Sequence, residues 1–163
     1  MLIVFSKNKQ DSDLFILKTI EKYLVSEGCV GINAPQVNRI KGKPFNTNPP
    51  PYISLSHSSE YIVCTAACLP VGVDVQIMKD MNFEKFSKRY YNRIVIDKFD
   101  FYKYWTFAEA KAKRNGNPLV EELKNADFSD CKTIDFIENY TLAVCTNDKS
   151  PITFWDLDNA LAE

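Results

Sequence analysis

Residues 69–77 read Leu-Pro-Val-Gly-Val-Asp-Val-Gln-Ile, and the fold is expected to centre on this stretch. Valine or isoleucine occupies every second position from Val71 to Ile77, which is the pattern of a buried β-strand. Asp74 stands in the middle, and a carboxylate in an apolar run is costly unless it is hydrogen-bonded, paired or bound to a metal. Gly72 leaves room for something to approach the backbone. The alternative is a strand edge at which Asp74 faces water.

A second stretch, residues 105–113, reads Trp-Thr-Phe-Ala-Glu-Ala-Lys-Ala-Lys and is rich in strong helix formers. Glu109 and Lys113 are four residues apart, so they share one face of the predicted helix. Such a pair would hold a divalent cation and a phosphate side by side. The alternative is an ordinary solvent-facing Glu–Lys pair, which is the commoner outcome of this spacing.

With a third segment, these stretches resemble the signatures of the 4′-phosphopantetheinyl transferases. That family has a strand of the form (Val/Ile)-Gly-(Val/Ile)-Asp-(Val/Ile) and, further along the chain, a helix of the form Trp-(Ser/Thr)-x-Lys-Glu-(Ala/Ser)-x-x-Lys. The third segment, residues 53–58, reads Ile-Ser-Leu-Ser-His-Ser and resembles the Ser-His-Ser strand that precedes both. The three motifs occur in family order, and the resemblance covers residues 42–146. It is a resemblance to the surfactin-synthetase-activating type.

The resemblance implies an α+β fold with two similar lobes, a pseudo-dimer. Each lobe would be a helix packed on a small antiparallel sheet, with the active site in the cleft between them. A faint internal repeat points the same way, because Gly42-Lys43-Pro44-Phe45 and Gly116-Asn117-Pro118-Leu119 are each followed by a strand that begins with tyrosine and later reads Cys-Thr. We expect an N-terminal lobe over residues 1–69 and a C-terminal lobe over residues 70–163.

The implied activity is that of a holo-[acyl-carrier-protein] synthase, a 4′-phosphopantetheinyl transferase. It moves 4′-phosphopantetheine from coenzyme A to a serine of an apo-acyl or peptidyl carrier protein. Such a transfer depends on alignment and charge neutralisation, and Mg²⁺ suits it because this ion binds one or two carboxylates together with substrate phosphates. The alternative is a catalytically weak or inactive relative that binds coenzyme A or a carrier protein.

The resemblance also implies a role for each matching side chain. The expected catalytic residues are Asp74, Glu109 and Lys113. The expected metal ligands are Asp74, Glu109 and, through its amide oxygen, Gln76. The expected contacts to the coenzyme are Lys43, Ser56, His57 and Lys113, which are basic or hydroxyl groups suited to phosphate. His57 is the one histidine of the sequence, and a lone histidine is often structural.

Three features depart from the family pattern. Gln76 stands where many relatives have glutamate, so the site would carry less negative charge and need more magnesium. Ala108 stands where the family usually has lysine, which would remove a positive charge near the site. The N-terminal lobe is short, so contacts to the adenine side of the coenzyme are expected to be missing.

Composition limits the class of protein. The chain has 163 residues and a net charge of −1, which argues against a general nucleic-acid binder. Five cysteines without Cys-x-x-Cys spacing suit a reducing compartment, and Cys64 and Cys68 are interpreted as small core residues. No stretch has the length of a membrane span or the character of a signal peptide, so we expect a cytoplasmic monomer without membrane contact.

Hydrophobic periodicity and breakers predict the remaining elements. Helices are expected over residues 13–25, 82–91 and 97–114, the first capped by Asp11 or Ser12 and the last stopped at residues 115–118. Strands are expected over residues 2–5, 52–55, 61–67, 71–77, 131–137, 140–146 and 152–155. Residues 29–52 are rich in proline and are expected to be mostly loop, and the last residues are expected to fray.

Overall fold

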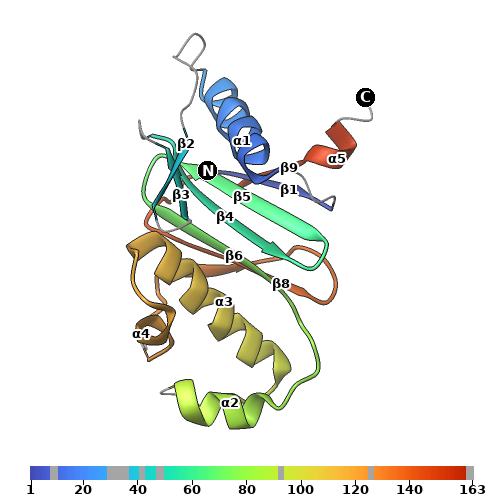
Figure 1. Cartoon of the computed structure of the whole chain (residues 1–163), viewed down its shortest axis with the longest axis vertical. Coiled ribbons are helices and arrows are strands. Elements are labelled where there is room, and N and C mark those ends of the chain that lie inside the picture. Colours follow the sequence, from blue (N-terminus) through green and yellow to red (C-terminus); the bar gives the residue numbers. More distant parts are fainter. Residues whose placement is uncertain are drawn as a thin grey trace.

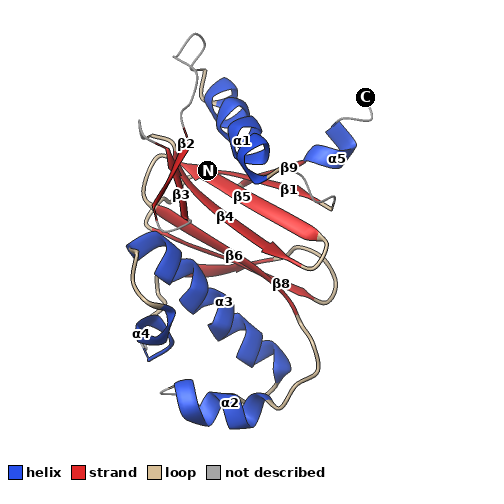
Figure 2. Ribbon diagram, in the orientation of Figure 1, coloured by secondary structure: helices blue, strands red, loops and turns tan. Residues whose placement is uncertain are grey.

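The computed structural model describes residues 1–7, 11–28, 37–40, 43–46, 50–91, 94–124 and 127–160, which form a mixed α+β fold (Figures 1 and 2). The helices are α1 (Ser12–Ser26), α2 (Phe83–Tyr90), α3 (Lys98–Asn115), α4 (Leu119–Lys124) and α5 (Leu157–Ala160). The strands are β1 (Leu2–Ser6), β2 (Val37–Ile40), β3 (Lys43–Asn46), β4 (Tyr52–Ser58), β5 (Tyr61–Ala67), β6 (Val71–Ile77), β7 (Cys131–Ile134), β8 (Tyr140–Thr146) and β9 (Thr153–Asp156).

The strands form three sheets. The largest has the order β4-β5-β1-β9, the second has the order β6-β8-β7, and β2 and β3 form a hairpin. All pairings are antiparallel except that of β1 with β9, which is parallel. Figure 1 shows α1 on one side of the sheets and α3 on the other, along β6 and β8.

Two apolar clusters lie on opposite faces of β1. Leu2 and Val4 point toward α1, where they pack with Phe15 and Ile20. The alternate side chain, Ile3, points toward the second sheet. There the shared cluster is Met1, Ile3, Val63, Ala67, Val71, Val73, Val75, Leu142 and Val144. The strand alternation of period two thus joins α1, the first sheet and the second sheet into consecutive layers.

The other face of β6 meets α3. Gly72 has the helix backbone directly above it, because a Cβ atom built on this residue would lie 1.8 Å from the carbonyl oxygen of Ala110. The sequence-based expectation of a close backbone approach at Gly72 is therefore confirmed. Asp74 follows two residues later on the same side of the strand, so the close packing of α3 also carries the helix over this carboxylate.

A row of serine hydroxyls joins β4 to β6. The hydrogen bonds run from the N–H groups of Val73, Val75 and Ile77 to the Oγ atoms of Ser54, Ser56 and Ser58, at 3.0, 3.2 and 3.0 Å. The two strands belong to different sheets, so side-chain hydroxyls take the place of backbone carbonyls as acceptors. We call these three hydrogen bonds the serine seam.

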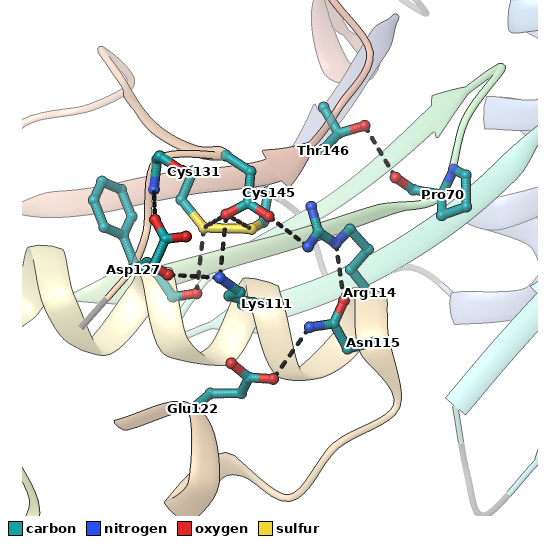
Figure 3. Close-up of polar contacts among 12 residues, drawn as sticks. Pro70, Lys111, Arg114, Asn115, Glu122, Asp127, Cys131, Cys145 and Thr146 are labelled. Atoms are coloured by element: carbon teal, nitrogen blue, oxygen red, sulfur yellow. Dashed lines mark hydrogen bonds and ion pairs between the residues drawn. A yellow bond between two sulfur atoms is a disulfide. The ribbon is translucent and has the colours of Figure 1, made fainter. Parts of the chain in front are cut away.

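A polar cluster joins α3 to the residues that precede β7 (Figure 3). Lys111 and Arg114 both pair with the carboxylate of Asp130, and all three side chains are largely buried. Lys111 Nζ also donates to the carbonyl oxygen of Asp127 at 2.5 Å. Beneath this cluster a disulfide joins Cys131 of β7 to Cys145 of β8, directly opposite each other in the ladder. The contacts of Lys111 and Arg114 with Asp130 set the rotation of α3 about its axis. They therefore also determine the direction in which Glu109 and Lys113 point.

Aromatic packing fixes the first half of α3. Phe86 of α2 lies 5.7 Å from Phe101 and 5.5 Å from Trp105, measured between ring centroids. The helix begins after Asp97, whose side chain accepts a hydrogen bond from the Asp100 N–H at 2.8 Å. It ends at Gly116, which has the left-handed conformation (φ 75°) that favours glycine at this position.

Most predicted elements are present with shifted ends. The strands over residues 61–67, 71–77 and 140–146 have the predicted bounds, and Asp11 caps α1 as one of the two predicted candidates. Four short elements were not predicted: β2 and β3 within the expected loop, α4, and α5 in the tail expected to fray. Part of that loop, including Gly42, lies outside the described residues.

Two further expectations change. Cys64 is buried as expected, but Cys68 is exposed and donates to Asp148, so its interpretation as a core residue was wrong. The disulfide was not anticipated, and the reducing compartment stays a prediction. No described helix combines the length and the apolar character needed to cross a membrane. The division into lobes of residues 1–69 and 70–163 also stays a prediction; β9 is placed in the sheet of β1.

Candidate functional site

Asp74 of β6 and Lys113 of α3 form the centre of the candidate site. Lys113 Nζ lies 2.8 Å from Asp74 Oδ1 and 3.0 Å from the carbonyl oxygen of Val73. The side chains of Asp74 and Lys113 are 7% and 22% exposed, so the ion pair is largely removed from water. The close contact of α3 with Gly72 sets this geometry, because it brings the last turns of the helix over the strand.

The two oxygens of Asp74 differ in their surroundings. Oδ1 accepts hydrogen bonds from Lys113 Nζ and from Ser56 Oγ, both at 2.8 Å. Oδ2 is buried and has no hydrogen-bond partner among the described residues. Burial raises the pKa of the Asp74 carboxyl, while Lys113 and Ser56 act in the opposite direction. A buried carboxylate oxygen without a donor is the condition in which a bound cation would be stabilising.

Glu109 stands one turn before Lys113 on the same face of α3. Burial raises the pKa of Glu109, and the negative charge of Asp74 raises it further, while Lys113 and Lys43 lower it. The charge of Asp74 therefore disfavours ionisation of Glu109. A pair of this kind binds either a proton or a cation, so it suits both proton transfer and metal coordination.

A pocket of about 720 Å³ opens beside Glu109 and Lys113. Among its lining residues are the predicted side chains Lys43, His57, Glu109 and Lys113. They come from β3 and β4, which are close in the sequence, and from α3, which is distant from both. Among the described lining residues, basic groups outnumber the two carboxylates, Glu60 and Glu109, which is the composition expected for a site that takes an anionic ligand.

Arg39 also lines the pocket, and the sequence analysis missed it. It lies on β2, in the segment interpreted as loop. Its guanidinium pairs with Asp13 and donates to Ser12 Oγ at 2.9 Å, so it joins the β2–β3 hairpin to the start of α1. Arg39 stands four residues before Lys43. This spacing indicates a shared site only if the two segments pair as antiparallel strands, and β2 and β3 do pair in this way.

Ser56 and Gln76, two other predicted site residues, have side-chain contacts outside the pocket wall. Ser56 is buried, accepts from Val75 N–H and donates to Asp74 Oδ1. Gln76 is partly buried, and its Nε2 lies 3.5 Å from the carbonyl oxygen of Ile77. Neither is among the described residues that line the pocket. A coenzyme contact for Ser56 and a metal contact for Gln76 thus stay predictions.

Ala108 is fully buried in an apolar cluster with Met78, Tyr91 and Phe101. The motif predicts that this position lies near the site and that a positive charge is lost there. Its side chain instead packs in the cluster between α2 and α3, away from the described pocket wall. The alanine at this position therefore contributes to the packing of α3.

Comparison with known proteins gives one distant relationship. No family model matches the chain. The chain is similar to the 4′-phosphopantetheinyl transferase gsp of Aneurinibacillus migulanus, with 23% identity over 151 positions. The match covers 84% of this chain and 59% of the relative, so the chain spans about three fifths of the length of that protein. This similarity supports a distant relationship to the phosphopantetheinyl transferases.

Proposed function

We propose that this protein transfers 4′-phosphopantetheine from coenzyme A to a serine of an apo-carrier protein in a magnesium-dependent reaction. The observation that carries the proposal is the contact of Lys113 with the buried Asp74, beside a pocket that Lys113 lines together with Glu109, Lys43 and His57. The named activity of the distant relative supports the same reaction.

The reaction breaks a phosphoanhydride bond of coenzyme A and forms a phosphoester bond to serine. The serine oxygen of the carrier protein forms a bond to the phosphorus that carries pantetheine, and the pyrophosphate P–O bond breaks. Adenosine 3′,5′-bisphosphate leaves with the electron pair of that bond, and the serine hydroxyl loses its proton. Glu109, in its carboxylate form, is the candidate acceptor, directly or through water, because its raised pKa makes it a stronger base than an ordinary glutamate.

The oxygen donors at the site fit Mg²⁺. Asp74 Oδ2 is buried and without a hydrogen-bond donor in the described structure, and the carboxylate of Glu109 is electrostatically coupled to Asp74. These two carboxylates would hold the ion, and Gln76 is a further candidate ligand. When bound, Mg²⁺ would neutralise charge on the pyrophosphate.

The basic residues would bind the phosphates of the coenzyme. Lys113 has one hydrogen bond to Asp74 and one to Val73, and an ammonium group has three hydrogens, so it retains a donor for a phosphate oxygen. Lys43 and His57 line the same pocket from β3 and β4. Their charge and hydrogen-bonding capacity would orient the pyrophosphate along the pocket.

The proposal is tested by incubation with coenzyme A, Mg²⁺ and several apo-carrier proteins, with intact mass as the readout. We expect a carrier to gain the mass of one phosphopantetheinyl group, and Glu109→Gln to lose most of this gain. A known transferase acting on the same carriers serves as the control. If that control works and this protein modifies none of them yet binds coenzyme A, it is a non-catalytic relative.

A further inference from the structure

We propose that Ser56 is a positioning residue that holds Asp74 with one oxygen occupied and the other available to a cation. The inference rests on the proposed function for the identity of the cation. It assigns Ser56 a role through Asp74, in place of a contact with the coenzyme. It follows from the serine seam, which places the Ser56 hydroxyl between two strands of different sheets.

The hydrogen-bond directions at Ser56 are determined by its neighbours. The N–H group of Val75 can only donate, so the Ser56 oxygen accepts at this contact, over 3.2 Å. The single hydroxyl hydrogen is then left for Asp74 Oδ1, at 2.8 Å. The Val75 N–H of β6 thereby orients the Ser56 hydroxyl, which donates to Asp74 on the same strand.

The second donor to Oδ1 is Lys113, also at 2.8 Å. With Ser56 and Lys113 both at Oδ1, the carboxylate has a fixed and unequal arrangement, and Oδ2 has no described partner. Without the Ser56 hydroxyl, Lys113 alone would hold Oδ1. A lysine on a flexible stem is a weak restraint on carboxylate rotation, so Oδ2 would lose its fixed position.

Another serine of the serine seam, Ser58, provides the control for a substitution at Ser56. Ser54 and Ser58 accept from β6 N–H groups as Ser56 does, over 3.0 Å in each case. Among the described contacts of these three serines, only that of Ser56 reaches the Asp74 carboxylate. Ser58 is buried like Ser56 and is not among the described pocket-lining residues. Ser58→Ala thus removes the same strand-joining contact without touching Asp74.

The test measures Mn²⁺ binding in the presence of coenzyme A, by the electron paramagnetic resonance signal of free Mn²⁺. The proteins are the wild type, Ser56→Ala, Ser58→Ala, Ser56→Thr and Asp74→Asn. We expect Ser56→Ala to weaken Mn²⁺ binding about tenfold, the lower end for groups that orient a ligand, with Ser58→Ala unchanged. Ser56→Thr, which keeps the hydroxyl, should recover most of the affinity. Coenzyme A affinity without metal should be the same in Ser56→Ala and wild type.

Further readouts separate a structural defect from the proposed role. Ser56→Ala should lower the unfolding temperature somewhat more than Ser58→Ala, because both lose one strand-joining hydrogen bond and Ser56→Ala also loses the hydrogen bond to Asp74. If Ser56→Ala does not fold, Ser56→Cys replaces it, since a thiol fills the space but is a weak donor. Equal Mn²⁺ affinity in Ser56→Ala (or Ser56→Cys) and Ser58→Ala overturns the inference while the proposed function stands. Wild-type protein that binds no Mn²⁺ overturns the inference and the metal site of the proposed function. Carrier modification then tests the transfer reaction separately.

Discussion

Lys113, close to the end of α3, reaches back to Asp74, in the middle of β6, and its Nζ lies 2.8 Å from Oδ1. The two residues are 39 positions apart in the sequence, and the contact ties the longest described helix to the central strand of the candidate site. The ion pair therefore has a structural role as well as the proposed catalytic one.

The first prediction concerns this ion pair. Lys113→Met should destabilise the protein by about 3 kcal/mol, because it leaves a buried carboxylate without its cation. The double variant Asp74→Asn, Lys113→Met should recover part of the loss, as measured by urea unfolding. Lys98→Met is the matched control, since Lys98 pairs with a fully exposed Asp80 and should change little. Wild-type stability in Lys113→Met would contradict the ion pair's structural role.

The second prediction uses two glycines. Gly72→Ala should cost about 3 kcal/mol or more, because the added methyl meets the backbone of Ala110, which cannot move without shifting α3. Gly28→Ala should cost only about 1 kcal/mol, since its environment is open and only its left-handed conformation (φ 71°) resists the substitution. Thermal unfolding of the two variants makes the comparison, and equal losses would refute the close approach of α3.

The third prediction concerns pH. The pKa values of Asp74 and Glu109 are raised above the ordinary 3.8 and 4.5, so the folded protein holds protons that the unfolded chain has released. Without a cation, the contribution of Asp74 and Glu109 to the free energy of unfolding therefore falls as the pH rises from their ordinary pKa values toward the raised ones. Glu109→Gln should remove part of this fall. Unfolding curves from about pH 4 to about pH 8 in a chelator test this, and an unaltered pH profile in the variant would exclude Glu109.

Added Mg²⁺ should reverse the trend. Because the ion competes with protons for the same carboxylates, it should raise the unfolding temperature more at the alkaline end of this range than at the acidic end. Asp74→Asn should abolish the magnesium effect. An equal shift at every pH would show that the ion binds elsewhere.

The fourth prediction concerns the disulfide. Replacing both Cys131 and Cys145 by serine should lower the free energy of unfolding by about 3 kcal/mol, the value for a loop of this length in the chain-entropy model. A reductant should have a similar effect on the wild type and none on the double variant. Cys68→Ser, at an exposed free cysteine, is the control. A reductant without effect on the wild type would show that the two sulfurs are not bonded.

The fifth prediction concerns Gln76. If position 76 contributes to the metal site, Gln76→Glu should lower the Mg²⁺ concentration for half-maximal transfer, because a carboxylate attracts the ion more strongly than an amide oxygen. Its side chain must first leave the carbonyl of Ile77. A magnesium titration decides the matter, and coincident curves for the two proteins would remove position 76 from the site.

The elements that carry the site could be predicted from the sequence because their signals are local. Alternating valines mark β6, and alanine-rich composition with a stop at Gly116 marks α3. The β2–β3 hairpin could not be predicted from the sequence, because it contains Pro44 and lies in a proline-rich segment that resembles a loop. Short elements such as α4 and α5 depend on tertiary packing, which local composition does not encode.

The partners of the predicted residues were harder to foresee. If the strands predicted over residues 131–137 and 140–146 were joined by the two residues between them as a hairpin, Cys131 would lie opposite Thr146. The observed connection runs from residue 135 to residue 139, and the register moves by one, which brings Cys131 opposite Cys145. For the serine seam a signal was present, since serines recur at every second position over residues 54–58. Its meaning depended on β4 lying beside β6, a contact between two different sheets.

The parallel pairing of β1 with β9 has a consequence for synthesis on the ribosome. β1 emerges long before residues 153–156, which supply one of its two neighbours in the sheet. Until those residues emerge, one edge of β1 has unpaired backbone groups that another chain can join. Completion of the first sheet is thus a late, long-range event, and a nascent chain paused before β9 is the species most exposed to aggregation.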